Sequence, residues 1–134
     1  MFNTKSKEST TISGILSTIT FNPDFSGLYA VGSYSNSIAI FNETDNSVCC
    51  VMEDRSEGTG ISHLQFSNDG MYLYAASRKS SNIVCWDIRQ TGTILYKLPR
   101  SAPTNQKLYF DITKDDNYLV TGSHVTFILN TLLI

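Results

Sequence analysis

The sequence contains an internal repeat with a period of about 45 residues. Its copies are GILSTITFNPDFSGLYAVGS from Gly14, GISHLQFSNDGMYLYAAS from Gly60 and KLYFDITKDDNYLVTGS from Lys107. Each copy has an alternating apolar strand pattern, a polar turn, a second strand of aromatic and small residues, and a terminal serine. A repeat of this kind restricts the chain to architectures built by stacking copies of one small unit.

The middle copy predicts four short strands in one period, at 61–66, 71–77, 82–88 and 94–98. Turn-forming residues separate them, for example Asn-Asp-Gly at 68–70. Four antiparallel strands per period are typical of a β-propeller blade, which buries its faces only against neighbouring blades. An ordinary β-sandwich also fits regular strand spacing, but it does not require the repeat.

The only tryptophan, Trp86, precedes Asp87 at the end of the third expected strand, NIVCWDI. This ending resembles a WD repeat, and the chain is therefore predicted to be an all-β, WD40-type β-propeller. In WD repeats a Gly-His, a Ser, a turn Asp and the Trp commonly form a buried hydrogen-bonded set. Ser77 and Trp86 fit, but Glu57 stands where the His belongs and Ser80 where the Asp belongs. The set is expected to be incomplete, so that the blade depends more on packing.

The repeats also predict how the chain is divided. Closed propellers need at least four blades, whereas the repeat fills this chain with about three. We expect part of a larger, seven-bladed propeller, with blades at about 14–52, 60–98 and 106–134 and a disordered or blade-edge segment at 1–13. After Ser123 the pattern is lost, with neither Trp-Asp nor a fourth strand. The sequence is therefore expected to be a fragment or a truncated gene product.

Longer stretches of the sequence resemble one particular family of WD-repeat proteins. YAVGSYSNSIAIF, GISHLQF, SRKSSNIVCWDIRQTG and TNQKLYFDITKDDNYLVTGS are similar, in order and spacing, to consecutive segments of the telomerase Cajal body protein family. A basic pair before CWD, an Arg after it, and TNQ before a strand ending in YFD are not features of generic WD repeats. Members of that family are WD-repeat proteins that bind small Cajal body RNAs and telomerase RNA. They direct these ribonucleoproteins to Cajal bodies.

The resemblance implies a scaffold without catalytic activity. Its partners would be a small Cajal body RNA or telomerase RNA, together with ribonucleoprotein proteins. Its location would be the nucleus and the Cajal body, with the cytoplasm left open as a second location. The alternative is a generic WD-repeat scaffold that binds only proteins.

Charge is unevenly distributed along the chain. The formal net charge of −2 argues against a broadly basic nucleic-acid surface. The window 78–107 nevertheless holds six basic residues and one acidic residue. A basic window can bind phosphates, but it can also be solvated surface charge or receive an acidic peptide.

The strand order places most of this basic charge on one rim. Antiparallel strands put Arg78, Lys79 and Arg100 on the same rim, with Lys107 close to it, whereas Arg89 leaves its strand toward the opposite rim. The candidate RNA contacts are therefore Arg78, Lys79, Arg100 and Lys107.

Sequence-specific binding of single-stranded RNA also needs exposed aromatic side chains for base stacking. Tyr34, in the corresponding turn of the preceding blade, is the one aromatic residue that the sequence places on this rim. His63 lies inside a strand and is expected to be a partly exposed structural residue without titratable neighbours.

Enzyme and metal sites find little support. The two histidines lie at non-equivalent blade positions, and nucleophile motifs, phosphate-binding glycine loops and metal-ligand spacings are missing from the sequence. Asp115 and Asp116 are expected to be ordinary turn residues. Cys49, Cys50 and Cys85 are odd in number, which favours buried thiols in a reducing compartment. We expect no cofactor, metal, small-molecule substrate or membrane partner.

Overall fold

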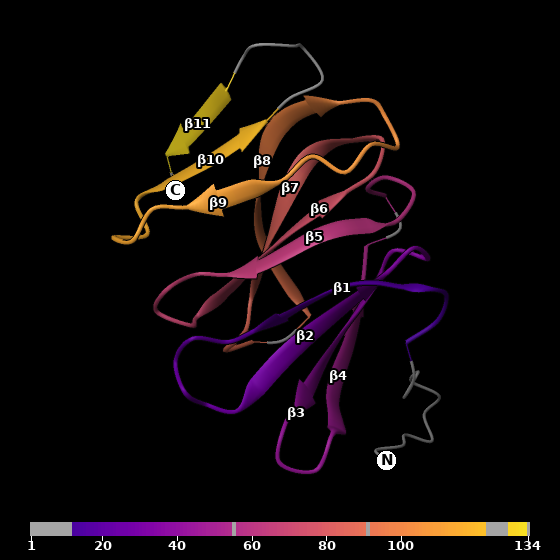
Figure 1. Cartoon of the computed structure of the whole chain (residues 1–134), viewed down its shortest axis with the longest axis vertical. Coiled ribbons are helices and arrows are strands. Elements are labelled where there is room, and N and C mark those ends of the chain that lie inside the picture. Colours follow the sequence, from indigo (N-terminus) through magenta and orange to yellow (C-terminus); the bar gives the residue numbers. More distant parts are fainter. Residues whose placement is uncertain (1–11, 55, 91, 123–128, 134) are drawn as a thin grey trace.

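The computed structural model of the chain describes residues 12–54, 56–90, 92–122 and 129–133. Within these ranges the regular secondary structure is β-strand alone, arranged in three antiparallel sheets that follow one another in chain order (Figure 1). The all-β prediction is therefore confirmed. The predicted leading segment 1–13 lies almost entirely outside the described residues.

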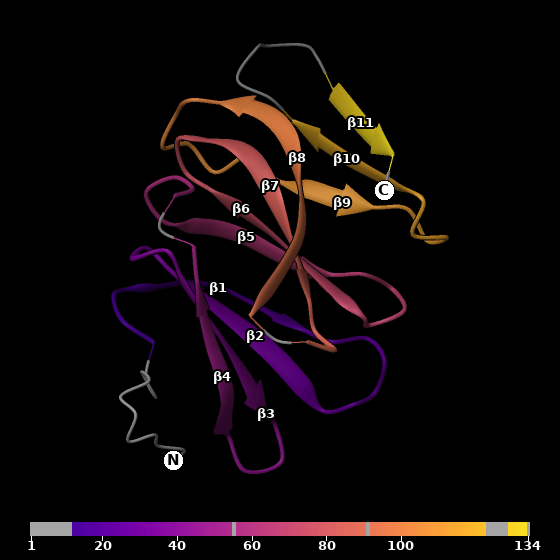
Figure 2. The ribbon, with the colours of Figure 1, turned by 180° about the vertical axis from the view of Figure 1, so that it is seen from behind.

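Each sheet is built from strands that are consecutive in the sequence. The first sheet contains β1 (Leu16–Phe21), β2 (Leu28–Ser33), β3 (Ser37–Asn42) and β4 (Ser47–Glu53). The second contains β5 (Ile61–Phe66), β6 (Tyr72–Ser77), β7 (Ser80–Asp87) and β8 (Thr93–Ala102). The third contains β9 (Phe110–Ile112), β10 (Tyr118–Gly122) and β11 (Leu129–Leu133). Seen from either side, β5 lies between β1 and β9 (Figure 2).

Apolar side chains pack between successive sheets. The first core cluster joins the first and second sheets and contains Ala30, Ile38, Ile40, Met52, Ile61, Leu64, Phe66, Leu73, Ala75, Val84 and Trp86. The second cluster joins the second and third sheets and contains Tyr74, Ala76, Ile83, Cys85, Phe110, Ile112 and Leu119. The second sheet is thus buried on both faces, as the alternation of side chains across a strand allows.

Polar turns fasten the sheets to one another at one end. The β5–β6 turn needs Gly70, whose φ is +77° and whose added Cβ would collide with Asp24. The Asn22 amide donates to the Gly70 carbonyl over 3.1 Å, and one blade later the Asn68 amide donates to the Thr113 carbonyl over 2.9 Å. The same kind of contact therefore recurs between successive sheets.

The β9–β10 turn explains the acidic pair. Asp115 Oδ1 accepts hydrogen bonds from Thr113 Oγ1 at 2.7 Å and from the backbone N–H of Asn117 at 3.0 Å. Asp116, at φ +61°, accepts from the backbone N–H of Asn68 at 2.8 Å. The Asp115 carboxylate therefore acts within the turn, whereas the Asp116 carboxylate binds the turn of the preceding sheet.

Three details differ from the sequence predictions. β7 begins at Ser80 instead of residue 82, so that only two residues separate it from β6, and its register with β8 shifts between Ser80 and Asn82. Past the end of the repeat pattern, β11 forms a third strand that pairs with β10. Cys85 is buried as expected, whereas Cys49 is exposed.

Candidate nucleic-acid interface

The turn between β6 and β7 consists of Arg78 and Lys79, and its backbone is held on both sides. The N–H of Arg78 donates to the Gly60 carbonyl at 2.8 Å, and the Arg78 carbonyl accepts from the N–H of Thr59 at 2.9 Å. On the other side the N–H of Lys79 donates to the Thr104 carbonyl at 2.9 Å. Two adjacent cationic residues therefore project from a turn whose conformation is fixed, although φ of Lys79 is +53°.

The two side chains of this turn differ in their contacts with the rest of the protein. The Arg78 guanidinium carbon lies 4.0 Å from the centre of the Tyr34 ring, and Nη2 donates to the Thr59 carbonyl at 3.0 Å. The Arg78 guanidinium therefore covers one face of the Tyr34 ring, and that face is not free to stack with a base. Lys79, by contrast, is exposed.

Arg100 is not on the exposed rim where the sequence analysis placed it. Its side chain is buried, with 3% of the residue exposed, and Nη1 donates to the Leu108 carbonyl at 2.9 Å and to Thr121 Oγ1 at 3.1 Å. Burial lowers the pKa of Arg100 below its usual value. The residue connects β8 to the third sheet, and we remove it from the candidate contacts.

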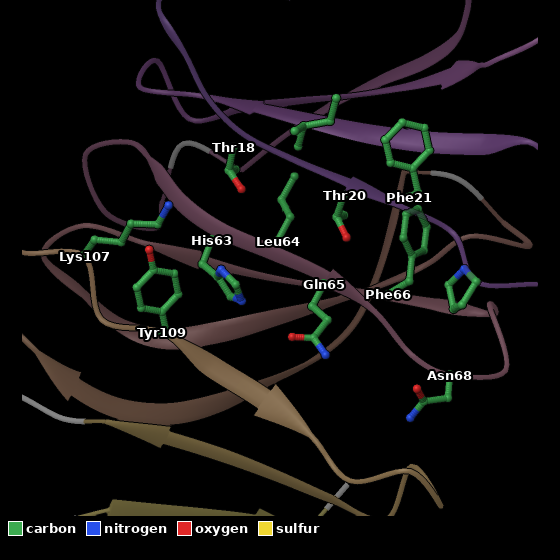
Figure 3. Close-up of a pocket in the computed structure, with 12 residues that line it drawn as sticks. Thr18, Thr20, Phe21, His63, Leu64, Gln65, Phe66, Asn68, Lys107 and Tyr109 are labelled. Atoms are coloured by element: carbon green, nitrogen blue, oxygen red, sulfur yellow. The ribbon is translucent and has the colours of Figure 1, made fainter.

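Lys107 is exposed and lies beside an aromatic residue that sequence reasoning missed (Figure 3). Its Nζ lies 5.0 Å from the centre of the Tyr109 ring, and Tyr109 is 61% exposed. Phe110 and Ile112 are buried, so strand alternation turns Tyr109 and Asp111 to the other face. That alternation was the signal in the sequence that could have identified Tyr109.

His63 reaches the same place from β5. Its ring meets Tyr109 edge-on at 5.2 Å and Phe110 edge-on at 4.6 Å. Burial lowers the pKa of His63, and the positive charge of Lys107 lowers it further, while Asp111 acts in the opposite direction. The prediction that His63 has no titratable neighbours is therefore wrong. Both neighbours, Lys107 and Asp111, belong to the following repeat of the sequence.

A cavity of about 490 Å³ opens in front of these residues. Thr18, Thr20 and Phe21 of β1 form one wall, and Lys107 and Tyr109 form the other, with β5 between them (Figure 3). Among the residues lining this cavity, Lys107 is the one with a full charge.

Glu57 closes a buried polar set in the second sheet. Its carboxylate accepts hydrogen bonds from Ser80 Oγ and from the Asn82 amide, the latter at 2.9 Å, and Lys97 Nζ lies 3.2 Å from Oε2. Lys97 also pairs with Asp54 at 3.1 Å. Glu57 and Ser80 therefore bond to each other at the places of the usual His and Asp. Among the described contacts, no hydrogen bond joins Ser77 or Trp86 to this pair, and the Ser77 hydroxyl donates to Asn36 instead.

Ser77, Trp86 and Asp87, the residues that match the WD repeat, all make contacts within the fold. Ser77 is buried, and its hydroxyl donates to Asn36 Oδ1 of the first sheet at 3.0 Å. Trp86 packs in the first core cluster, with 2% of the residue exposed. Asp87 accepts from the backbone N–H of Arg89 at 2.9 Å and pairs with Arg89 Nε at 3.2 Å, which lowers the pKa of Asp87. Arg89 thus lies at the opposite end of β7 from the basic turn.

The part of the chain that the structure describes contains no group of three or more His, Cys, Asp or Glu residues placed to hold a metal ion. It also contains no helix that is long and apolar enough to cross a membrane.

Comparisons with known proteins agree with the fold. A family model described as "Lactonase, 7-bladed beta-propeller" matches residues 18–126, more than half of the chain. The predicted β-propeller is thereby confirmed.

Several curated proteins are similar in sequence. Human Telomerase Cajal body protein 1 is 40% identical over 111 residues, which cover 83% of this chain and 20% of the human protein. Guanine nucleotide-binding protein negative regulator 1 of Schizosaccharomyces pombe is 38% identical over 113 residues, covering 84% of this chain and 28% of that protein. The Drosophila melanogaster Telomerase Cajal body protein 1 homolog is 33% identical over 70 residues, covering 52% of this chain and 13% of that protein. The chain thus spans about a fifth of the mammalian relatives that it matches.

Proposed function

This chain belongs to the telomerase Cajal body protein family of β-propellers, and from that premise we propose that it is an RNA-binding scaffold. Its RNA would be a small Cajal body RNA or telomerase RNA, which it guides as a ribonucleoprotein to Cajal bodies. Its other partners would be ribonucleoprotein proteins, and its location the nucleus.

The fixed backbone of the Arg78–Lys79 turn is the observation that carries this proposal. The carbonyls of Gly60 and Thr104 accept hydrogen bonds from the backbone N–H groups of the turn and hold it before any ligand arrives. A phosphate that binds there does not have to order the chain, so less free energy is lost on binding. Lysine and arginine side chains are the usual phosphate contacts of nucleic-acid-binding proteins.

Lys107 adds a third proposed phosphate contact, in the segment that links β8 to β9. Thr104, which accepts the hydrogen bond from Lys79, lies three residues before Lys107 in the segment that links β8 to β9. The proposed RNA contacts are therefore Arg78, Lys79 and Lys107. Phosphate contacts at these residues would supply affinity, but they would not read the base sequence.

A scaffold that binds only proteins is the second candidate. The burial of Arg100 and the contact of Arg78 with Tyr34 favour it, since both reduce the positive charge that is free for phosphates. Neither candidate function is enzymatic, although the family model that matches the chain carries a lactonase name.

Ultraviolet crosslinking in cells separates the two candidates. RNA should be recovered covalently bound to the protein, and peptide mapping should place crosslinks near residues 78–79 or 104–107. Recovery of partner proteins without crosslinked RNA would contradict the proposal and favour the protein-only scaffold.

A further inference from the structure

Tyr109 is a large aromatic side chain that remains exposed at the edge of a cavity. The cavity of about 490 Å³ lies within the roughly 300–1,000 Å³ range of small-ligand pockets. Tyr109 is 61% exposed, whereas its neighbour in sequence, Phe110, is buried. An accessible ring beside a preformed cavity is the feature that a planar ligand group requires.

The surroundings of Tyr109 suit the two parts of a nucleotide. The ring can stack with a base, and Lys107 Nζ, 5.0 Å from the ring centre, can pair with the phosphate of that nucleotide. His63 meets Tyr109 edge-on and so supports the ring from the side (Figure 3). Burial keeps the pKa of His63 below its usual value, so the supporting imidazole is neutral at pH 7.

Polar groups that can meet the edge of a base line the rest of this cavity. Thr18 and Thr20 lie on the wall opposite Tyr109, and Asn68 lies at the far end (Figure 3). The Gln65 amide is held in place because it donates to Asp111 Oδ1 at 2.8 Å. Hydroxyl and amide groups of this kind are those that read the edges of unpaired bases.

The cavity shares one residue with the proposed phosphate contacts. Lys107 belongs to both, and the segment from Thr104 to Lys107 connects the basic turn to the cavity. Lys107 is therefore the proposed phosphate contact that also borders the cavity. Tyr34 is less exposed than Tyr109, at 40% against 61%, and the Arg78 guanidinium lies closer to its ring than Lys107 Nζ lies to the Tyr109 ring.

We propose that the cavity between β1, β5 and Tyr109 receives one unpaired base of single-stranded RNA, stacked on Tyr109, with its phosphate at Lys107. This inference rests on the proposed function and adds base recognition to it. Arg78 and Lys79 supply phosphate contacts, whereas Tyr109 contacts the base itself.

Fluorescence binding of short single-stranded oligoadenylate and oligouridylate, each compared with an abasic oligonucleotide of equal length, tests the inference. Tyr109→Ala should weaken binding of the base-containing strands roughly five- to hundred-fold, the range measured for lost base stacking. It should leave binding of the abasic strand and the salt dependence unchanged. Tyr109→Phe should retain binding, and Tyr118→Ala, which removes another exposed aromatic of the third sheet, is the matched control.

The outcomes distinguish this inference from the proposed function. If Arg78→Gln/Lys79→Gln weakens binding while Tyr109→Ala does not, the base site is wrong and the RNA scaffold stands. If Tyr109→Ala weakens the abasic strand as much as the others, Tyr109 does not contact a base. If none of the strands binds, both proposals fail, and a peptide bound through Tyr109 would assign the cavity to a protein partner instead.

Discussion

Phe21 and Phe66 stand at equivalent places in β1 and β5, each paired with the second strand of its sheet, yet Phe21 is 57% exposed and Phe66 is 3% exposed. The same difference in burial is found in the third strand of each sheet. Trp86 of β7 is buried against the first sheet, whereas Phe41 of β3 is partly exposed and stacks on Tyr29 at 5.2 Å.

The difference between the first two sheets lies in what covers them. The second sheet has a described neighbour on both faces, and the first sheet has one on a single face. A repeated sequence pattern therefore fixes which side chains share a face, while the neighbouring sheet decides how much each contributes to stability.

The largest effect should come from Trp86. Trp86→Ala removes a side chain buried between two sheets and should lower the free energy of unfolding by about 3–5 kcal/mol. Phe41→Ala, at the equivalent and partly exposed position, should lower it by about 1 kcal/mol. Denaturant unfolding measures both changes. Equal losses for the two variants would contradict the difference in burial.

A smaller effect should follow from Glu57. Glu57→Ala leaves Ser80, Asn82 and Lys97 without their shared acceptor, which should cost about 1–3 kcal/mol in the same measurement. Glu43→Gln, at an exposed turn of the first sheet, is the control and should change stability by less than about 0.5 kcal/mol. If Glu57→Ala behaves like this control, the polar set does not stabilise the second sheet.

The second sheet should also make stability depend on pH in a way that the first sheet does not. His63 of β5 can bind a proton, whereas Thr18, at the equivalent place in β1, cannot. The pKa of His63 is lowered below 6.5 in the folded protein. The unfolded chain therefore binds the proton more readily, so stability present above pH 6.5 should be lost as the pH falls through the folded pKa. Lys107 increases this loss, and Asp111 reduces it.

Unfolding measured between pH 7 and pH 5, with and without His63→Gln, checks this expectation. The variant should show a weaker fall of stability over this interval than the original protein. An unchanged pH dependence would show that His63 is not buried in its neutral form.

Local patterns in the sequence predicted the strands, the turns and the propeller. Alternation identified Leu64 and Phe66 as core residues, and the position of Trp86 identified the repeat type. These features depend on neighbours a few residues away, which the sequence displays directly.

Contacts between distant residues limited the site prediction. Arg100 can be buried because the Leu108 carbonyl, just before β9, and Thr121 of β10 accept its hydrogen bonds. Glu57 takes the place of the usual His because it lies in the connection before β5 and bonds to Ser80, the first residue of β7. The spacing of residues in the sequence does not reveal these contacts. The sequence alone therefore could not assign Arg100 and Glu57 to the surface or to the interior.

The dependence of RNA affinity on salt tests whether Arg78 and Lys79 bind the phosphates of RNA. Arg78→Gln/Lys79→Gln should weaken binding of a small Cajal body RNA and make the slope of log affinity against log salt shallower by about 0.7 per lost single-strand phosphate contact. Arg89→Gln/Lys114→Gln removes the same charge from exposed residues at the opposite ends of the strands and should change the slope less. An unchanged affinity and slope for the first variant, with its fold intact, would contradict the account and leave a scaffold that binds only proteins.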